Sequence, residues 1–515
     1  MLAALLVASG ASACTGGSSS GGDSAYRAAA LDTPSCLPAT LPGGWTVHRV
    51  LTEPPLVPMY GVSAASHADG DWTIGGTTPG TLAAVGPAAQ PRWSPAGETP
   101  LGAPDTNTGV VERLSADGDL EWIAWADDAP FLFVAGGVPD GGVLIWGPVT
   151  ETTALRVSGR PPVEATVPGT PSAPGYAQPN LLVARIAPDG EVAWMRVFGL
   201  HDVDSYYAAG LIGESATALP DGGVALVGRT GQGLLVESAS AAPLADFRAE
   251  DERAPFVLRL DADGEVLWAR VPQPSNSGTR ISEPAPYGAN GVAVIVGMYN
   301  DMVAYDRDGA ITLEGKLGAN TGSRRLEGLL ELPDGDLLAH GTLPKPYVGR
   351  YSHEGDQYQG GPIGQFTETP MIGGRFGPAT AYGGRYYAGV TDGAFTLGFG
   401  VETFSFPGDG GALFDFIVAL GPNTEVMGAV MLSGSSANFG WGAHMSASPE
   451  AHLRVVSPRT GPSALVTPEG RLELLRDADW DPFDFDASRT LMLELEPTDA
   501  APNVETCGDW WHPAE

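Results

Sequence analysis

Short apolar runs alternate with polar turn residues along most of the chain. The clearest example is residues 216–228, where two apolar segments flank Pro220-Asp221-Gly222-Gly223. An Asp-Gly turn between two alternating apolar segments is a strong local signal for a β-hairpin. The pattern therefore predicts many short antiparallel strands rather than long helices.

This hairpin pattern recurs along the chain and alternates with a second one. The other copies of the first pattern are at residues 67–76, 134–147, 287–297, 329–341 and 379–389, with a degraded copy at 443–456. The second pattern is clearest at residues 256–268 and recurs at 111–122, 182–194, 302–313, 348–358, 416–427 and 464–474. Each first hairpin is followed by a second one.

Two consecutive hairpins form a four-stranded meander, which cannot bury its own faces and must stack on its neighbours. We therefore predict an all-β fold, a single seven-bladed β-propeller of four-stranded antiparallel blades. A sandwich or two smaller propellers are the alternative packings, but no linker with a shift in composition divides the chain.

The alternating units, Asp-Gly-Gly-apolar-Gly and apolar-Arg-x-Asp-Gly-x-x-Trp, resemble the short propeller repeats of bacterial surface proteins of the SBBP type. Residues 393–400 followed by 415–420 are the most specific part of this resemblance, which covers about residues 60–475. The resemblance implies a fold far more than a function.

Two side chains recur in register within the second hairpin. They are a tryptophan at Trp122, Trp194 and Trp268 and an arginine at Arg113, Arg185 and Arg259. A large aromatic residue repeated in register predicts packing between blades. We expect each arginine to be held by an ion pair or by a backbone carbonyl group.

Composition agrees with a turn-rich fold that has a substantial core. The 515 residues include 71 Gly and 45 Pro, yet 43% are hydrophobic and 12 are Trp. The formal net charge is −34, and Lys316 and Lys345 are the chain's lysines. Phosphate groups would be repelled by this charge, so nucleic acid is excluded as an expected partner.

The N-terminal residues predict export and attachment to a membrane. Residues 2–13 are apolar but too short to span a bilayer, as in an export signal. Ala11-Ser12-Ala13-Cys14 resembles the lipobox of bacterial lipoproteins, which implies a lipid on Cys14. An ordinary secretory signal is the alternative. We accordingly expect a signal peptide at 1–13, a lipidated, flexible Gly/Ser-rich tether at 14–35 and the propeller at 36–515.

If Cys14 is lipidated, two cysteines remain, Cys36 and Cys507. An exported protein is in an oxidising setting, where an even number of cysteines favours disulfide bonds. We predict a disulfide bond between them that clamps the two ends of the folded region. Residues 45–51 and 489–495 read as strands outside the repeats, and we expect these strands to lie close together.

Any binding surface should lie on the face with the longer connections, opposite the tight Asp-Gly turns. One of these loops brings together His201, Asp202, Asp204, Tyr206 and Tyr207. These side chains could bind a metal or a sugar, although exposed acidic and aromatic loop residues usually bind neither.

The sequence has no recognisable motif that predicts a catalytic, cofactor-binding or metal-ligating residue. The eight histidines lack the spacing of a zinc site. The sequence favours an exported, membrane-tethered, non-enzymatic binding or scaffold protein of the cell envelope, located at the outer membrane or else secreted. Its expected partner is a protein or polysaccharide. A propeller enzyme acting on polysaccharide, a quinone-dependent oxidoreductase and a purely structural envelope component are the alternatives.

Overall fold

The computed structural model describes residues 34–513 with internal gaps. The gaps are 53–59, 86–89, 96–106, 128, 150–152, 167–179, 202–210, 232, 238–241, 248–253, 274–279, 298–299, 318–324, 344–346, 354–356, 363, 367–371, 381–382, 392–394, 398–403, 407–413, 435–442, 460–462 and 477–488. The described secondary structure is antiparallel β-sheet apart from one 3₁₀ helix, η2 (Val504–Trp510).

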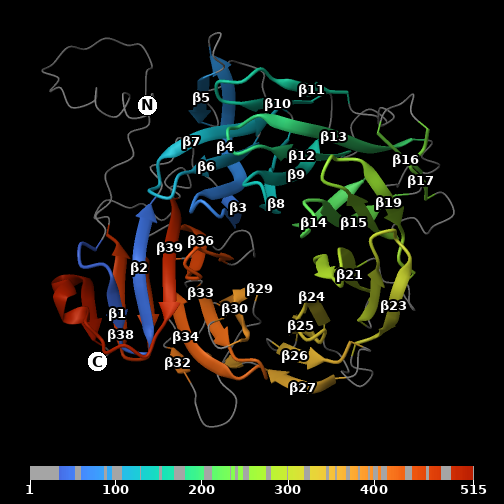
Figure 1. The fold of residues 1–515 in the computed structure, drawn as a ribbon. Helices are drawn as coiled ribbons and strands as arrows, with labels where there is room; N and C mark the ends of the chain where they lie inside the picture. Colours follow the sequence, from blue (N-terminus) through green and yellow to red (C-terminus); the bar gives the residue numbers. More distant parts are fainter. Residues whose placement is uncertain are drawn as a thin grey trace, which may run out of the picture.

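Six four-stranded blades, each built from two consecutive hairpins, stand around a centre (Figure 1). Blade 1 contains β3 (Tyr60–Ser66), β4 (Trp72–Val85), β6 (Asn107–Leu114) and β7 (Leu120–Ala126); blade 2 contains β8 (Phe133–Gly137), β9 (Val143–Val149), β12 (Asn180–Ile186) and β13 (Val192–His201); blade 3 contains β14 (Ile212–Ala218), β15 (Val224–Thr230), β18 (Ala254–Leu260) and β19 (Val266–Arg270). Blade 4 contains β20 (Ala285–Tyr287), β21 (Gly291–Val296), β22 (Asp301–Tyr305) and β23 (Ile311–Lys316); blade 5 contains β24 (Arg325–Glu331), β25 (Leu337–Leu343), β26 (Tyr347–Tyr351) and β27 (Gln357–Pro362); blade 6 contains β29 (Ile372–Ala379), β30 (Arg385–Thr391), β33 (Phe414–Leu420) and β34 (Val426–Leu432).

A sheet built from both ends of the chain fills the space between blade 6 and blade 1. This closing sheet has the order β35 (His444–Ala447), β36 (Leu453–Arg459), β39 (Arg489–Pro497), β2 (Trp45–Thr52) and β1 (Ala39–Leu41). Strand β2 runs antiparallel to β39, from Trp45 opposite Pro497 to Thr52 opposite Leu491, which confirms that the two terminal strands lie together. Trp45 is fully buried in the core that the closing sheet shares with blade 6.

The predicted count of seven blades of two hairpins each was wrong. Six blades follow that plan, and the expected seventh pair of hairpins is divided between two sheets. Its first hairpin, β35–β36, enters the closing sheet, whereas its second, β37 (Ser463–Thr467) with β38 (Gly470–Leu475), adds to β34 of blade 6. The strands expected outside the repeats, β39 and β2, take the third and fourth places in the closing sheet.

Hairpins inserted between the second and third strands of one sheet cover the outer edge of the preceding blade. β10 (Thr153–Val157) and β11 (Val163–Ala165) add to β7 of blade 1, and β16 (Leu234–Val236) and β17 (Ala245–Asp246) add to β13 of blade 2. Hairpin β37–β38 does the same for blade 6. A covered edge cannot pair with another chain. Parts of these long connections therefore join blades instead of forming free loops.

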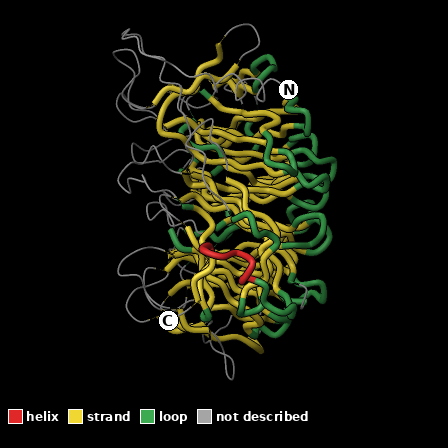
Figure 2. The backbone as a smooth tube through the Cα atoms, turned by 90° about the vertical axis from the view of Figure 1, so that its left-hand side faces the viewer, coloured by secondary structure: helices red, strands yellow, loops and turns green. Residues whose placement is uncertain are grey.

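The remaining short strands decorate the same ring. β5 (Gln90–Pro95) pairs with β4, and β40 (Trp511–Pro513) pairs with β38. β28 (Gly364–Phe366), β31 (Phe395–Leu397) and β32 (Phe404–Phe406) form a separate three-stranded sheet. Figure 2 shows most of the described turns and loops gathered along one side of the ring.

The tight turns depend on glycine in a left-handed conformation. In the first hairpin of blade 3, Gly222 has a φ of 82°, and its amide donates to the carbonyl oxygen of Leu219. Asp221 completes the turn by accepting a hydrogen bond from the amide of Gly223. Residues with a Cβ atom rarely adopt this φ, so the Asp-Gly pair fixes the turn and the register of both strands.

The repeated arginine links each of blades 1 to 3 to the blade that follows it. Arg259 is fully buried; its Nη2 donates to Asp221 Oδ2 at 2.6 Å within blade 3, and its Nη1 donates to the carbonyl oxygen of Asn290 in blade 4 at 2.6 Å. Arg113 and Arg185 likewise pair with turn aspartates of their own blades and donate to carbonyl oxygens of the next. The prediction of an ion pair or a carbonyl partner is confirmed, and both are present.

The repeated tryptophan also joins neighbouring blades, as predicted. Trp268 Nε1 of blade 3 donates to the carbonyl oxygen of Arg307 in blade 4 at 2.9 Å. Its ring covers Gly309, where an added Cβ atom would lie 2.7 Å from the indole. Trp122 and Trp194 make the same bond to Pro188 and Ala262. Blades 1 to 3 are thus each held to the next blade by apolar packing and directed hydrogen bonds.

The predicted disulfide is confirmed. Cys36, which precedes β1, is bonded to Cys507 of helix η2, and their Cα atoms are 5.0 Å apart. Asn503 adds to this junction, because its side-chain oxygen accepts a hydrogen bond from the amide of Thr40 in β1. The two ends of the described chain are therefore joined both by the β2–β39 ladder and by a covalent bond.

We expect the double substitution Cys36→Ser/Cys507→Ser to destabilise the oxidised protein. The bond closes a loop with a sequence separation of 471. A loop of this length restricts the unfolded chain by up to about 6 kcal/mol in the chain-entropy estimate. Urea denaturation followed by tryptophan fluorescence measures the effect, with Cys14→Ser as the matched control. Equal midpoints for the double variant and the control would contradict the prediction.

Candidate functional site

The loop predicted from the sequence as a ligand site is described only at its first residue. His201 ends β13, and its backbone is paired with Leu234 of β16. Asp202, Asp204, Tyr206 and Tyr207 lie outside the described residues, as does Cys14. A ligand role for this loop and a lipid on Cys14 both stay predictions.

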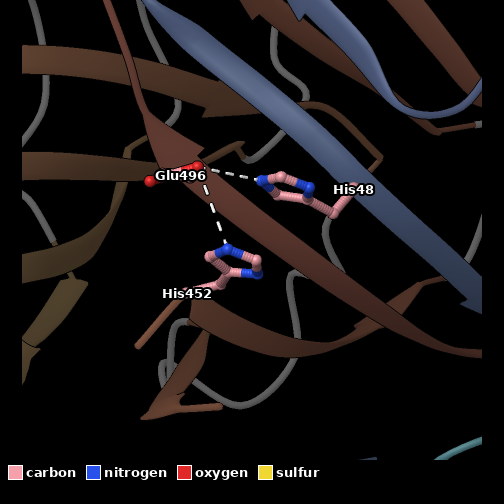
Figure 3. Close-up of side chains that lie close together, drawn as sticks. All are labelled: His48, His452 and Glu496. Carbon is pink, nitrogen blue, oxygen red and sulfur yellow. Dashed lines mark hydrogen bonds and ion pairs between the residues drawn. The ribbon is translucent and has the colours of Figure 1, made fainter. Parts of the chain in front are cut away.

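A different group of side chains comes together on one face of the closing sheet. His48 comes from β2, His452 from the turn between β35 and β36, and Glu494 and Glu496 from β39 (Figure 3 shows all but Glu494). The glutamates are two residues apart on one strand, so their side chains share a face, while Leu493 and Leu495 point into the core. Strands from both ends of the chain are needed to assemble this group.

His48 reaches this face because it occupies a β-bulge. Val47 lies opposite Leu495 and Arg49 opposite Glu494, which leaves His48 as the extra residue of β2. A bulge re-aims the side chain that it inserts. Val47 and Val50 are buried, whereas His48 and Arg49 between them are partly exposed. The imidazole therefore lies on the outer face beside the glutamates.

His452 is positioned by a tight turn. Ser448 Oγ accepts hydrogen bonds from the amides of Glu450 and His452, and the amide of Ser448 donates to the carbonyl oxygen of His452. The His452 ring stacks on that of His48, with centroids 4.0 Å apart and planes 4° from parallel. The turn and the bulge thus present two imidazoles side by side.

Both imidazoles face carboxylate oxygens. The distance from His48 Nε2 to Glu496 Oε2 is 3.1 Å, and that from His452 Nε2 to the same oxygen is 3.8 Å. His452 Nδ1 lies 2.9 Å from Glu494 Oε1. Glu494 is 8% exposed, while the side chain of Glu496 is 43% exposed. One carboxylate is therefore buried against a ring nitrogen, and the other is open to solvent.

A second polar cluster lies between blades 5 and 6, beside the innermost strands. His340 of β25 packs edge-on against Phe376 and Tyr387. Burial, and next Arg375, lower the pKa of His340 to about 3, and burial raises the pKa of the Tyr387 hydroxyl well above its usual range. His340 Nδ1 and the Tyr387 hydroxyl have no hydrogen-bond partner among the described residues. Both side chains are closed off from solvent.

Histidines buried in the neutral form make stability depend on pH. Burial, followed by the charge of Arg113, lowers the pKa of His67 to about 4 from an ordinary 6.5. Between these values the unfolded chain binds a proton that the folded chain does not, so this contribution to stability is lost as pH falls. His340 acts in the same direction, with a window that extends to about pH 3.

We therefore expect the urea midpoint to fall between pH 7 and pH 5. His67 alone should account for about 2 kcal/mol at pH 5, by proton linkage between its folded and unfolded pKa values. The variant His67→Gln keeps a polar group beside Thr73 and should show a shallower decline in the free energy of unfolding. A decline as steep as that of the unchanged protein would contradict the prediction.

The closing-sheet cluster could not be found from sequence spacing. His48 and Glu496 are 448 positions apart, and His452 belongs to a turn that lacks the Asp-Gly signal. The sequence did predict that the strands at residues 45–51 and 489–495 lie side by side. That prediction alone would have placed His48 close to Glu494.

Comparisons with known proteins give neither a family nor a curated relative. No family model and no curated protein matches the chain. Among solved structures, streptogramin B lyase has 11% identity over 88% of this chain and 98% of its own, with a TM-score of 0.40. The Dos1 propeller has 8% identity, coverage of 87% and 95% and a TM-score of 0.38. YCF48 bound to D1 peptide has 9% identity, coverage of 89% and 99% and a TM-score of 0.35.

The class of protein follows from the sheet topology. Radial four-stranded antiparallel sheets closed by a sheet from both termini define a β-propeller protein. Within the residues that the structure describes, no helix has the length and apolar character needed to cross a membrane.

Proposed function

We propose that this chain is an exported β-propeller lipoprotein, attached to a bacterial envelope through a lipid on Cys14, that binds another macromolecule. The observation that carries the proposal is the disulfide between Cys36 and Cys507. Disulfides persist in oxidising compartments outside the cytoplasm. This agrees with the export signal read from residues 2–13 and with the lipobox-like Ala11-Ser12-Ala13-Cys14.

The ring supports a binding role because it is rigid and its two faces differ. Arginine and tryptophan bonds fix neighbouring blades, and the Asp-Gly turns hold one face in tight hairpins. The strands that flank the longer connections meet them at the opposite face, and loops on a rigid scaffold are the usual place for recognition. A protein or polysaccharide of the envelope is the partner that we propose. The net charge of −34 opposes nucleic acid.

A propeller enzyme is the second candidate. The observation in its favour is the pair His340 and Tyr387, whose buried polar atoms lack partners among the described residues and whose pKa values are strongly shifted. Catalysis requires contact with a substrate, however, and these side chains are 1% and 0% exposed. Binding is therefore the better supported function.

The attachment is tested by fractionating bacteria that produce the protein or its Cys14→Ser variant. We expect the unchanged protein in the membrane fraction, labelled by radioactive palmitate, and the variant unlabelled in the soluble fraction. The matched control is Cys36→Ser/Cys507→Ser, which removes cysteines from the folded region and should stay labelled. Membrane association of Cys14→Ser equal to that of the unchanged protein would refute the anchor.

A further inference from the structure

We propose that His48, His452 and Glu496 form a binding site for a divalent transition-metal ion, with Glu494 as the carboxylate that orients His452. The site would join β2 to β39 and to the β35–β36 turn, which are three parts of the closing sheet. The proposal rests on the closing sheet alone and is independent of the proposed attachment and binding function.

The geometry of the donor atoms is the first argument. One nitrogen from each imidazole and one oxygen of Glu496 lie within 4.8 Å of one another. Glu496 Oε2 lies 3.1 Å from His48 Nε2 and 3.8 Å from His452 Nε2. Donor atoms about 2.0–2.2 Å from a tetrahedral zinc ion are roughly 3.3–3.6 Å apart. These separations suit one ion once the two rings, whose planes are 4° from parallel, tilt so that their in-plane lone pairs converge.

The orientation of His452 is the second argument. Its Nδ1 lies 2.9 Å from the buried carboxylate of Glu494, so in the neutral ring the proton resides on Nδ1. Nε2 is then the atom that would bind a metal, and it lies 3.8 Å from Glu496 Oε2. A histidine that ligates a metal usually donates its other N–H group to a carboxylate in this way.

The third argument comes from comparing the closing sheet with blade 1. Arg113 precedes the bulge between the third and fourth strands of blade 1, and Glu494 takes the equivalent place in the closing sheet. Around Arg113 lie the carboxylates of Asp69, Asp71 and Glu121. In the closing sheet, Glu450, His452 and His48 take these three positions, as the register of the strands shows.

The closing sheet therefore lacks the guanidinium group that occupies this position in blade 1. It keeps side chains around the position that can donate electron pairs to a cation. In blade 1, a guanidinium group is held by three carboxylates at distances of 2.8–3.0 Å. In the closing sheet, a carboxylate stands where the guanidinium group would be, among side chains that can themselves bind a cation. A metal ion beside Glu494 would restore the charge pattern that the other position obtains from arginine.

Two arginines lie on the same face, and the charge of Arg454, which is opposite Glu494, acts on Glu494 and Glu450. Arg49 donates to the carbonyl oxygen of Ala116 and lies 3.3 Å from Asp117 Oδ1, both in blade 1. Arg454 stacks on the Trp72 ring at 4.3 Å and donates to the carbonyl oxygen of Asp71. Both guanidinium groups contact the neighbouring blade, and the carboxylates of Glu450, Glu494 and Glu496 outnumber them on this face.

The test uses the full-length, oxidised protein after treatment with a chelator. Zinc chloride is added alone in isothermal titration calorimetry, and thermal unfolding is followed with and without zinc. We expect one zinc ion per chain and a rise in the unfolding temperature. His48→Ala and His452→Ala should each weaken binding by at least about tenfold. Glu494→Gln should weaken it by about 10–100-fold, as is typical of a partner that orients a ligand.

The matched control is His512→Ala. His512 also faces a glutamate, with Nε2 3.0 Å from Glu473 Oε1, but it has no second imidazole beside it among the residues that the structure describes. This variant should bind zinc as the unchanged protein does. His48→Gln provides a second variant with similar side-chain size if His48→Ala fails to fold.

Three results would overturn the proposal. They are an absence of zinc binding, binding that His48→Ala and His48→Gln leave unchanged, and an equal loss in His512→Ala. Cobalt(II) in place of zinc gives an independent readout, because a tetrahedral site produces intense visible absorption bands. Loss of these bands in His452→Ala, with circular dichroism unchanged, would support direct ligation.

Discussion

The backbone ladder between β2 and β39 is the interaction on which the ring depends. Without β2 the closing sheet would end at β39, and its outer edge would be left without a partner. The ladder also brings Trp45, Val47 and Val50 against Leu493 and Leu495 in one buried core. The disulfide between Cys36 and Cys507 lies beside this ladder and limits how far its two strands can separate.

In blades 1 to 3 a repeated set of bonds holds one blade to the next. Arg259 connects a turn aspartate of blade 3 to a carbonyl group of blade 4, and Trp268 makes a second bond across the same boundary. The closing sheet departs from this plan, because Glu494 takes the arginine position and Arg49 takes the tryptophan position. Departures from a local rule are expected at functional or strained places. Blades 4 and 6 also depart from the plan, with Ala304 and Ala419 at the arginine position, but in the closing sheet the departure coincides with the cluster of His48, His452 and Glu496.

Much of the fold could be predicted from the sequence because its signals are local. An Asp-Gly turn between apolar runs specifies a hairpin, and a tryptophan repeated in register specifies a packing position, so the paired hairpins of six blades were predicted correctly. The sheet that residues 464–474 join could not be predicted in the same way. Their local pattern specifies a hairpin, but the sheet that a hairpin joins depends on which outer edge is open, in this case β34.

The candidate site on the closing sheet depends on contacts between the two ends of the chain, and it was missed for that reason. His48 faces outward because of a bulge, and His452 is placed by a turn without glycine, so neither has a motif of its own. The loop from His201 to Tyr207 did have a suggestive composition. Apart from the backbone of His201, it lies outside the residues that the structure describes.

Native-state hydrogen exchange tests most directly whether the β2–β39 ladder is part of the global fold. In the oxidised protein we expect the paired amides of β2 and β39 to exchange as slowly as those of β15 and β18 in blade 3, because all should open only in global unfolding. Exchange of the β2 amides many times faster than those of blade 3, with the disulfide intact, would contradict the account. The N-terminal strand would then be a peripheral addition to a ring that closes without it.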